Sequence, residues 1–216
     1  GFEVTYLDVD ADGIVDLEQL KREIKDTTIL VSIMYANNEI GTIQPIKEIT
    51  EIAHAHGALM HTDAVQAAGN IPVDVKKLGV DLMSMSGHKI YGPKGIGSLY
   101  MKKGVKIHNL IHGGAQERRK RAGTENIPAI VGYGKAAEMA KENMENHIAE
   151  LTRLRNKLIE GVLERIPHTR LNGHRTNRLP GNANFSFEFI EGEGILLLLD
   201  QLGIAASSGL ACTSGS

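Results

Sequence analysis

The sequence predicts an α/β fold: a largely parallel sheet with helices on both faces, followed by the start of a smaller α+β domain. Short apolar runs of strand length alternate with helical patterns through Met85, which is typical of parallel sheets. The run Thr28–Met34 is nearly all apolar, as expected of a strand covered on both faces. Beyond Asn126 the alternation gives way to one long helical pattern. We therefore place a large domain at residues 1–144 and the start of a smaller domain at residues 145–216.

The first elements follow from local patterns. Alternating side chains over Glu3–Val9 predict a strand. Asp16 suits the N-cap of a helix over Leu17–Ile24. Pro45 then opens a second helix over Ile46–His56, because proline is preorganised for the first helical turn.

Three further apolar runs extend the sheet. Ala58–His61 and Val80–Met85 each predict a short strand. Ser98–Met101 follows so closely that we expect it to pair antiparallel with its predecessor. Ile127–Ile166 then predicts one long helix, or two helices end to end, closed by Pro167.

The last part of the chain has α+β character. Ala183–Phe189 predicts a strand, and Gly192–Leu202 holds an apolar helix. Ile204–Ala206 predicts another short strand. These elements form the beginning of the smaller domain.

Composition excludes several classes of protein. The 216 residues carry a net charge of −2, so no overall basic surface indicates nucleic acid. No apolar run approaches about 18 residues, so no membrane span is expected. The chain has one cysteine, which excludes an internal disulfide and fits a reducing, cytoplasmic location.

The segment around Lys89 is the first candidate for a site. It reads M-S-G-H-K-I-Y-G-P-K-G-I-G and directly follows the strand predicted at residues 80–85. Ser86 and His88 supply hydrogen-bonding groups, and the glycines let the backbone approach a ligand closely. A lysine held at a strand end can act as a nucleophile. On its own, the segment fits a surface lysine in a Gly-Pro turn equally well.

A carboxylate at an earlier strand end gives this lysine a partner. Asp63 and Gln66 follow the strand at residues 58–61, so both can face one ligand. An aspartate there can pair with a protonated ring nitrogen, although it can equally cap a helix. The spacing from Asp63 to Lys89 leaves room for one crossover to a neighbouring strand. Together the two residues fit pyridoxal phosphate, which needs a lysine amine and a pyridinium partner.

Two more segments carry polar or reactive side chains, Asn38 and Cys212, that could contact a ligand or take part in a reaction. Asn38 follows a buried strand and can donate and accept toward a planar ligand, although Asx turn chemistry explains it equally well. Cys212 lies among serine, glycine and threonine residues, which favours an accessible loop over a buried thiol. A thiolate in such a loop can attack an electrophile.

The basic run Arg118–Arg121 lies between Gly113-Gly114 and Gly123-Thr124. Alone it could be a nuclear signal or a nucleic-acid patch, but the flanking glycines favour an ordered loop. A cationic loop ending in backbone amides and the Thr124 hydroxyl could bind phosphate. A solvated charged loop is the competing interpretation.

Two metal hypotheses are weak. Residues 8–13 open like a calcium loop, but Gln19 stands where a bidentate glutamate is required, so a solvated turn is the better account. His54, His56 and His61 have no nearby cysteine to complete a zinc set. We therefore expect a surface and rim role for these histidines, and no metal site.

Five linked motifs then become informative together. They are N-N-E-I-G at Asn37, H-T-D-A-V-Q at His61, S-G-H-K-I-Y-G-P-K-G at Ser86, R-A-G-T at Arg121 and S-S-G-L-A-C-T-S at Ser207. In order and spacing they resemble the cysteine desulfurases of the NifS/IscS type, within the fold-type I pyridoxal phosphate enzymes. The resemblance extends over essentially all 216 residues.

The resemblance implies roles around the cofactor ring. Lys89 would hold pyridoxal phosphate covalently and then move the α-proton of the substrate. Asp63 would keep the pyridine nitrogen protonated, and Gln66 would contact the phenolic oxygen of the ring. Asn38 would also lie against the cofactor.

The resemblance also implies a phosphate site, a sulfur acceptor and partners. Ser86 and His88 would bind the phosphate, and Thr124 would bind the phosphate of the partner subunit's cofactor, which implies a homodimer. Cys212 would take the sulfur of L-cysteine as a persulfide and leave L-alanine. The persulfide would pass sulfur to an acceptor such as an iron–sulfur scaffold protein.

The chain departs from the family pattern through absences. The family's glycine- and threonine-containing phosphate loop and its ring-stacking histidine have no counterpart here. The arginine that holds the substrate carboxylate is also missing, since no arginine follows Cys212. We therefore expect both domains to be incomplete and this chain alone to be inactive. The alternatives are a selenocysteine lyase, another fold-type I lyase or aminotransferase, and an inactive dimerisation or scaffold-binding module.

Overall fold

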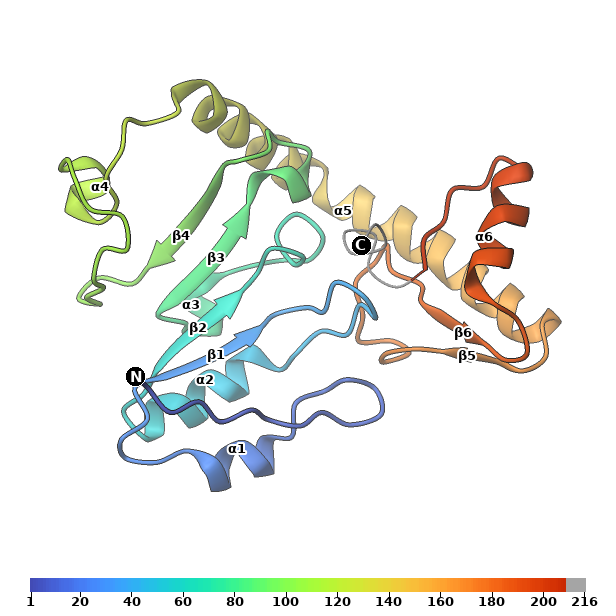
Figure 1. Ribbon diagram of the computed structural model, residues 1–216, viewed down its shortest axis with the longest axis horizontal. Coiled ribbons are helices and arrows are strands. Elements are labelled where there is room, and N and C mark those ends of the chain that lie inside the picture. Colours follow the sequence, from blue (N-terminus) through green and yellow to red (C-terminus); the bar gives the residue numbers. More distant parts are fainter. Residues whose placement is uncertain (209–216) are drawn as a thin grey trace.

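The computed structural model describes residues 1–208 of the chain. Within this range, the main sheet has four strands in the order β1-β2-β3-β4 (Figure 1). Their bounds are β1 Leu30–Met34, β2 Leu59–Asp63, β3 Leu82–Ser86 and β4 Gly97–Met101. β1, β2 and β3 are parallel, whereas β4 is antiparallel to β3. The prediction of a largely parallel sheet is confirmed. The prediction that Ser98–Met101 pairs antiparallel with the strand before it is also confirmed.

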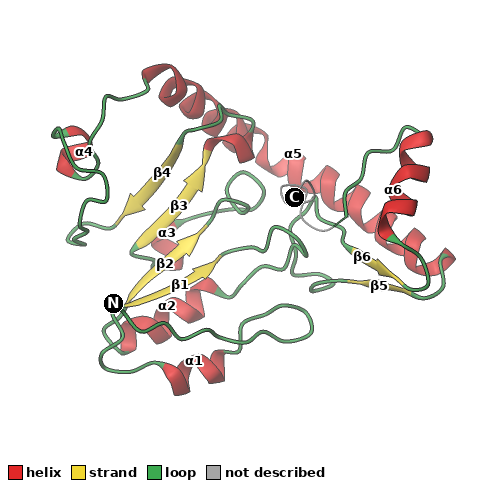
Figure 2. Cartoon of the chain, viewed as in Figure 1, coloured by secondary structure: helices red, strands yellow, loops and turns green. Residues whose placement is uncertain are grey.

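Helices and a second, two-stranded sheet complete the described part of the chain (Figure 2). The helices are α1 Leu17–Glu23, α2 Ile46–Ala55, α3 Val75–Leu78, the 3₁₀ helix η1 Gly87–Ile90, α4 Gln116–Arg119, α5 Ile127–Arg165 and α6 Gly192–Gln201. The second sheet pairs β5 Thr169–Leu171 antiparallel with β6 Phe185–Phe187. None of the helices in this range combines the length and the apolar character that a membrane crossing requires.

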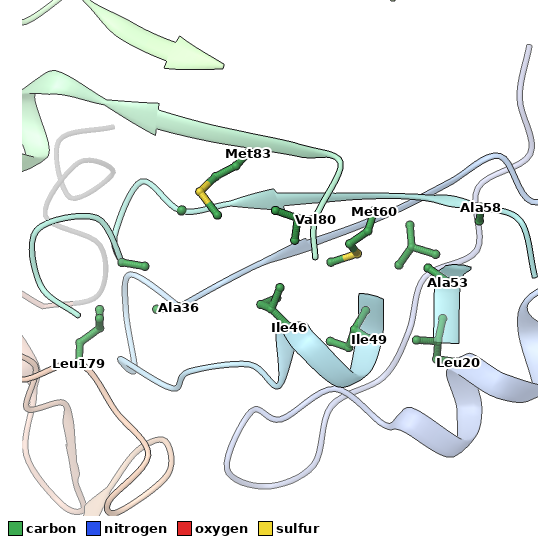
Figure 3. Packing of buried hydrophobic residues seen from close by; sticks show 13 residues of the cluster. Leu20, Ala36, Ile46, Ile49, Ala53, Ala58, Met60, Val80, Met83 and Leu179 are labelled. Carbon is green, nitrogen blue, oxygen red and sulfur yellow. The ribbon is translucent and has the colours of Figure 1, made fainter. Parts of the chain in front are cut away.

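α2 covers one face of the main sheet and supplies much of the core (Figure 3). Ile46, Ile49 and Ala53 share one side of the helix, because residues three and four apart lie above one another. They pack against Met60 of β2 and Met83 of β3, and all five side chains are buried. Burying side chains of this size stabilises the fold by roughly 1.5–3 kcal/mol each, so α2 and the sheet form one unit.

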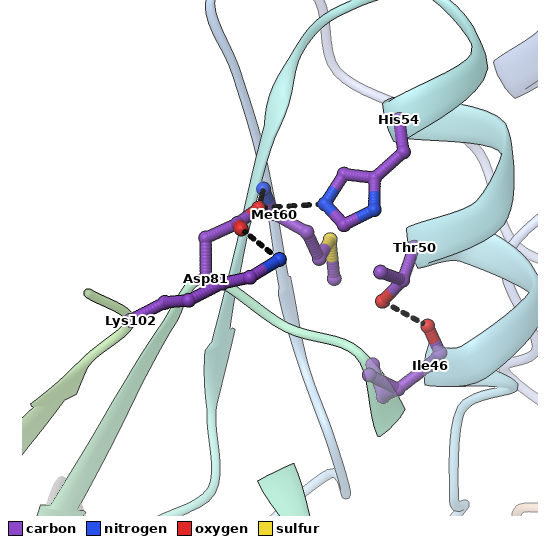
Figure 4. Close-up of polar contacts among 6 residues, drawn as sticks. All are labelled: Ile46, Thr50, His54, Met60, Asp81 and Lys102. Atoms are coloured by element: carbon purple, nitrogen blue, oxygen red, sulfur yellow. Dashed lines mark hydrogen bonds and ion pairs between the residues drawn. The ribbon is translucent and has the colours of Figure 1, made fainter. Parts of the chain in front are cut away.

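Asp81 ties the amino-terminal edge of the sheet together (Figure 4). Its buried carboxylate accepts hydrogen bonds from the Met60 amide at 2.9 Å and from Lys102 Nζ at 3.1 Å, and it pairs with His54 Nε2 at 2.7 Å. Burial raises the pKa of Asp81, but these three hydrogen bonds outweigh burial and leave the pKa below its ordinary value. His54 therefore has a structural partner at the edge of the sheet.

α5 is a single helix of 39 residues, about 58 Å long at 1.5 Å per residue. The Asn126 side chain caps its start by accepting a hydrogen bond from the Ala129 amide at 3.3 Å. The helix contacts both η1 and β5. Tyr133, in its first half, lies beside Gly87 of η1, and β5 lies near its far end in Figure 1. Of the two predicted arrangements, one long helix and two helices end to end, the first is correct.

Two predicted strands are wrong. Residues Glu3–Val9 make only one isolated bridge, from Val9 to Val15, and Tyr6 is 85% exposed. Ile204–Ala206 joins no ladder among the described residues. Both segments have strand-like composition, but a strand forms only where a neighbour offers its backbone groups. Within residues 1–208 neither segment pairs with a strand, and the first has a backbone neighbour only at its end, around Val9.

Candidate functional site

Polar groups gather at the carboxyl edge of β1, β2 and β3, the edge at which these parallel strands end. Met34, Asp63 and Ser84 lie beside one another in the register of the sheet. The arrowheads of the three strands in Figure 2 point the same way. The loop after β1, Asp63 and the η1 segment with Lys89 are therefore brought to one edge, where ligands of open α/β sheets bind. The expectation that Asp63 and Lys89 follow neighbouring strands is confirmed.

Lys89 lies in η1, directly after β3, and its side chain is partly buried. Within residues 1–208 its amine makes no hydrogen bond and no ion pair. Lys89 also borders a cavity of about 260 Å³ between η1 and α5. Beside it, Ser86 Oγ lies 2.7 Å from His88 Nδ1, so two predicted phosphate ligands form one polar pair. The lysine amine is thus free to bind a ligand covalently.

Close packing fixes the backbone around Lys89. A side chain added at Gly87 would lie 2.9 Å from Ile96 Cγ2 and 3.2 Å from Tyr133 of α5. A side chain added at Gly92 would lie 2.9 Å from the Gly87 carbonyl. Glycine is required at these positions because the loop folds back on itself and on α5. In the described residues, the close approach of this loop is to its own fold and to α5.

Asp63 ends β2 and is partly buried. Its Oδ1 accepts a hydrogen bond from the Val65 amide at 2.8 Å, as in an Asx turn. Its other oxygen, Oδ2, has no hydrogen-bond donor in the described part of the chain. Gln66 is also partly buried, and its side-chain amide is likewise unengaged within residues 1–208, although its carbonyl accepts from Asn70 Nδ2 at 3.0 Å. Both proposed ring contacts thus keep free polar atoms.

In the loop after β1, two adjacent asparagine side chains have different surroundings. Asn37 Oδ1 accepts hydrogen bonds from the amides of Glu39 at 2.8 Å and Ile40 at 3.0 Å. Asn38 is exposed, and its side chain makes no hydrogen bond within residues 1–208. The Asx turn chemistry that competes with a ligand role for Asn38 therefore belongs to Asn37.

A distant segment holds this loop in place. The buried guanidinium of Arg178 donates from Nη2 to the Ile40 carbonyl at 2.8 Å and to Asn182 Oδ1 at 2.9 Å. Asn182 Nδ2 in turn donates to the Glu39 carbonyl at 2.8 Å. Burial, with the nearby charges of Arg155 and Arg175, lowers the pKa of Arg178 to about 10, so it stays charged at neutral pH. The sequence gives no sign of this contact, because the partners are far apart along the chain.

A hydrogen-bonded chain of side chains crosses β1, β2 and β3. Ser32 Oγ lies 2.8 Å from His61 Nδ1, and His61 Nε2 lies 2.9 Å from Ser84 Oγ. Burial lowers the pKa of His61, and the charge of Asp63 opposes that shift. Neither serine is among the predicted site residues. The available signal is the order His61-Thr62-Asp63 on one strand, since alternate residues share a face.

Thr124 and the basic run lie apart from this edge. Figure 1 shows α4, which contains part of the run, beyond β4 and away from the arrowheads of β1, β2 and β3. Thr124 is exposed, and the Gly123 amide donates to Gln116 Oε1 at 3.2 Å, which closes the loop on itself. Within residues 1–208, no hydrogen bond links Thr124 to the Lys89 segment.

Three other predictions end differently. The turn at residues 8–13 is confirmed, because Asp10 Oδ1 accepts from the amides of Asp12 and Ile14, both at 2.9 Å. Over residues 1–208, no three histidine, cysteine, aspartate or glutamate side chains converge as a metal site. Cys212 lies outside the described residues, so its loop has no structural account.

Comparison with known proteins gives a consistent picture. Residues 1–216 match the family described as Aminotransferase class-V. A curated relative from Methanosarcina thermophila, Cysteine desulfurase IscS, is 61% identical over 100% of this chain and 53% of its own length. Cysteine desulfurase IscS of Dictyoglomus turgidum is 57% identical over 100% of this chain and 55% of its own length. The chain therefore spans about half the length of the curated relatives it matches.

Solved structures agree with the fold. A NifS-like protein superposes with a TM-score of 0.90 at 43% identity, covering 96% of this chain and 57% of that one. The NifS-like protein from Rickettsia africae gives a TM-score of 0.87 at 34% identity, over 94% of this chain and 57% of that one. The predicted fold class is confirmed by these neighbours.

Proposed function

Because the chain belongs to the aminotransferase class-V family, we propose that the protein works as a pyridoxal phosphate-dependent cysteine desulfurase. One observation carries the proposal: the Lys89 amine and the Asp63 Oδ2, which make no hydrogen bond within residues 1–208, lie at the ends of neighbouring strands on one sheet edge. The relatives named Cysteine desulfurase IscS, at 57% and 61% identity, support the same activity.

The residues at this edge fit the cofactor by their chemistry. Lys89 supplies an amine for the aldehyde, and Asp63 a carboxylate for the pyridine nitrogen. Ser86 and His88 supply a hydroxyl and an imidazole for the phosphate. The exposed Asn38 and the partly buried Gln66 supply amides for the ring and its phenolic oxygen. When bound, pyridoxal phosphate supplies an electron sink for the charge left after removal of the α-proton.

Each residue then has a defined task. The Asp63 carboxylate holds a proton on the ring nitrogen, because a nearby negative charge stabilises the protonated form. The Lys89 amine would hold the cofactor and, when not bonded to it, would carry the α-proton of the substrate. The Asx turn from Asp63 Oδ1 to the Val65 amide orients the carboxylate so that Oδ2 faces away from its own turn. This geometry lets one side chain serve both the fold and the cofactor.

The sulfur step belongs to Cys212. Its thiolate would attack the sulfur atom of the bound L-cysteine, so that the S–S bond of the persulfide forms as the C–S bond breaks. The carbon skeleton would keep the electron pair of the C–S bond, take up a proton and leave as L-alanine. A sulfur acceptor such as an iron–sulfur scaffold protein then receives the persulfide sulfur. The glycine- and serine-rich sequence around Cys212 supports a role that requires the thiol to be accessible.

The proposal includes a homodimer and two domains. Thr124 is exposed and follows the basic run, and α4, which contains part of that run, lies beyond β4 (Figure 1). This placement supports the use of Thr124 at the cofactor phosphate of a partner subunit. The boundary between residues 1–144 and 145–216 falls within α5, which contacts both η1 and β5. α5 would then be the connection between the two domains.

Turnover of L-cysteine by the full-length protein tests this function. We expect pyridoxal phosphate-loaded wild type to release equal amounts of L-alanine and transferable sulfur. Cys212→Ala should lose sulfur uptake while the visible absorption of the bound cofactor is retained. Equal alanine and sulfide yields from Cys212→Ala and wild type would contradict the persulfide role. Faster turnover of selenocysteine than of cysteine would favour a selenocysteine lyase.

A further inference from the structure

We propose that His61 is a positioning residue for Asp63: its ring joins the strands on either side of Asp63 through the hydroxyl groups of Ser32 and Ser84. This inference rests on the proposed function, because it deepens the role of Asp63 at the cofactor ring. It concerns residues that lie wholly within the described sheet.

His61 lies two positions before Asp63 on β2. The two residues are separated by one position on β2, so their side chains lie on the same face, about 7 Å apart along the strand. Ser32 of β1 pairs with His61 in the register, and Ser84 of β3 pairs with Asp63. The bonds from His61 to both serines therefore pin the two strands that flank Asp63.

Both ring nitrogens are engaged, and this sets the plane of the ring. Nδ1 lies 2.8 Å from Ser32 Oγ, and Nε2 lies 2.9 Å from Ser84 Oγ. A serine hydroxyl can donate or accept, so a neutral imidazole with one donor and one acceptor nitrogen is fully satisfied here. Three strands are thus joined by side chains as well as by backbone hydrogen bonds.

The charge of the ring also matters to Asp63. The groups that face the ring from β1 and β3 are uncharged hydroxyls, and the charged group that acts on it from its own strand is Asp63. Burial lowers the pKa of His61 against the pull of Asp63, which favours a neutral ring. A protonated ring would attract the Asp63 carboxylate and weaken its hold on a pyridinium proton.

Two substitutions separate positioning from simple packing. His61→Leu removes both hydrogen bonds, whereas His61→Gln keeps a neutral side chain with a donor and an acceptor. In the full-length protein loaded with pyridoxal phosphate, we expect His61→Leu to weaken cofactor binding by about tenfold and to lower kcat with KM for L-cysteine little changed. His61→Gln should recover most of both losses. The matched control is His56→Gln, because the exposed ring of His56 hydrogen-bonds within residues 1–208 only to the Ile52 carbonyl of its own helix.

Imidazole ¹⁵N NMR of the cofactor-free full-length protein gives a second, independent measurement. We expect one neutral tautomer of His61 at neutral pH, with protonation only at a lower pH than that of an ordinary histidine because burial lowers its pKa. We also expect a shift of its hydrogen-bonded nitrogen in Ser84→Ala. A protonated ring at neutral pH would overturn the proposal, as would His61→Leu with the cofactor affinity and kcat of wild type. If His61→Leu does not fold, Ser32→Ala and Ser84→Ala decide, because each removes one bond and should weaken cofactor binding. Wild type that binds no pyridoxal phosphate would refute the proposed function, while the NMR result would still stand for His61.

Discussion

Arg178 Nη2 lies 2.8 Å from the carbonyl oxygen of Ile40 and donates a hydrogen bond to it across 138 residues of sequence. The bond joins the segment between β5 and β6 to the loop that presents Asn38. The Leu179 amide adds a second link by donating to the Gly41 carbonyl at 2.8 Å. The cofactor edge of the sheet is therefore shaped in part by the α+β region.

We expect Arg178→Lys to destabilise the protein by about 2–4 kcal/mol, because several buried acceptors lose their donor and each costs about 1–3 kcal/mol. A lysine lacks the planar guanidinium whose Nη1 donates to the His174 carbonyl while Nη2 donates to the Ile40 carbonyl. The free energy of unfolding in urea measures the loss. Arg175→Lys is the control, since Arg175 is exposed, and it should change stability by less than about 0.5 kcal/mol. Equal effects of the two substitutions would show that the contact is unimportant.

Asn37 and Asn38 should respond to alanine in opposite ways. Asn37→Ala removes the acceptor for two amides and should lower the free energy of unfolding by about 1 kcal/mol. Asn38→Ala should leave unfolding unchanged and weaken pyridoxal phosphate binding, because the exposed Asn38 side chain holds no part of the loop. Urea unfolding and cofactor titration distinguish the two. A destabilised Asn38→Ala with normal cofactor affinity would reverse the assignment.

Adding a methyl group at Gly87 should disturb the Lys89 segment. Gly87→Ala would press on Ile96 and Tyr133, and overpacking of this kind costs about 1–3 kcal/mol. Gly134→Ala, in open space on α5, should instead stabilise by about 0.5–1 kcal/mol, since alanine favours helix. Thermal unfolding of the pair, with cofactor affinity measured alongside, checks this. A Gly87→Ala protein as stable as wild type would mean that the loop relaxes freely.

The hydrogen bonds of Asp81 with His54, Lys102 and the Met60 amide make the free energy of unfolding depend on pH. Its folded-state pKa lies below the ordinary value of about 3.9, so the native state binds fewer protons than the unfolded state at low pH. The stabilisation is therefore complete above about pH 5 and is lost as pH falls through the folded pKa. We expect Asp81→Asn to cost about 2–4 kcal/mol at neutral pH.

Urea unfolding of wild type and Asp81→Asn across this range measures the effect. The difference between the two proteins should narrow as pH falls from about 5 to 3. Asp26→Asn is the control, because Asp26 is exposed. A difference that stays constant with pH would mean that the cluster does not titrate with folding.

Patterns in the sequence predicted the parts of the fold that depend on residues close together along the chain. The apolar run before Asn37 and the Pro45 start of α2 identify β1 and α2 to within two residues. Glu3–Val9 and Ile204–Ala206 have the same local appearance, yet neither forms a strand. A strand depends on a second strand that can lie anywhere in the chain, and local composition carries no information about where that second strand is.

The candidate site shows the same division. Lys89, Asp63, Ser86 and His88 could be predicted because each stands at the end of an apolar run. The bonds from His61 to Ser32 and Ser84 depend on register between strands, which local patterns leave open. Asn37 and Asn38 are equivalent in sequence, and only the turn geometry assigns the capping role to the first.

The most direct test of the central claim is to identify which lysine holds the cofactor. The full-length protein, loaded with pyridoxal phosphate, is reduced with borohydride so that the bond to lysine becomes permanent, and its peptides are mapped by mass spectrometry. The account predicts the pyridoxyl group on Lys89, and none on the nearby Lys94. Modification of a different lysine, or of none, would contradict it.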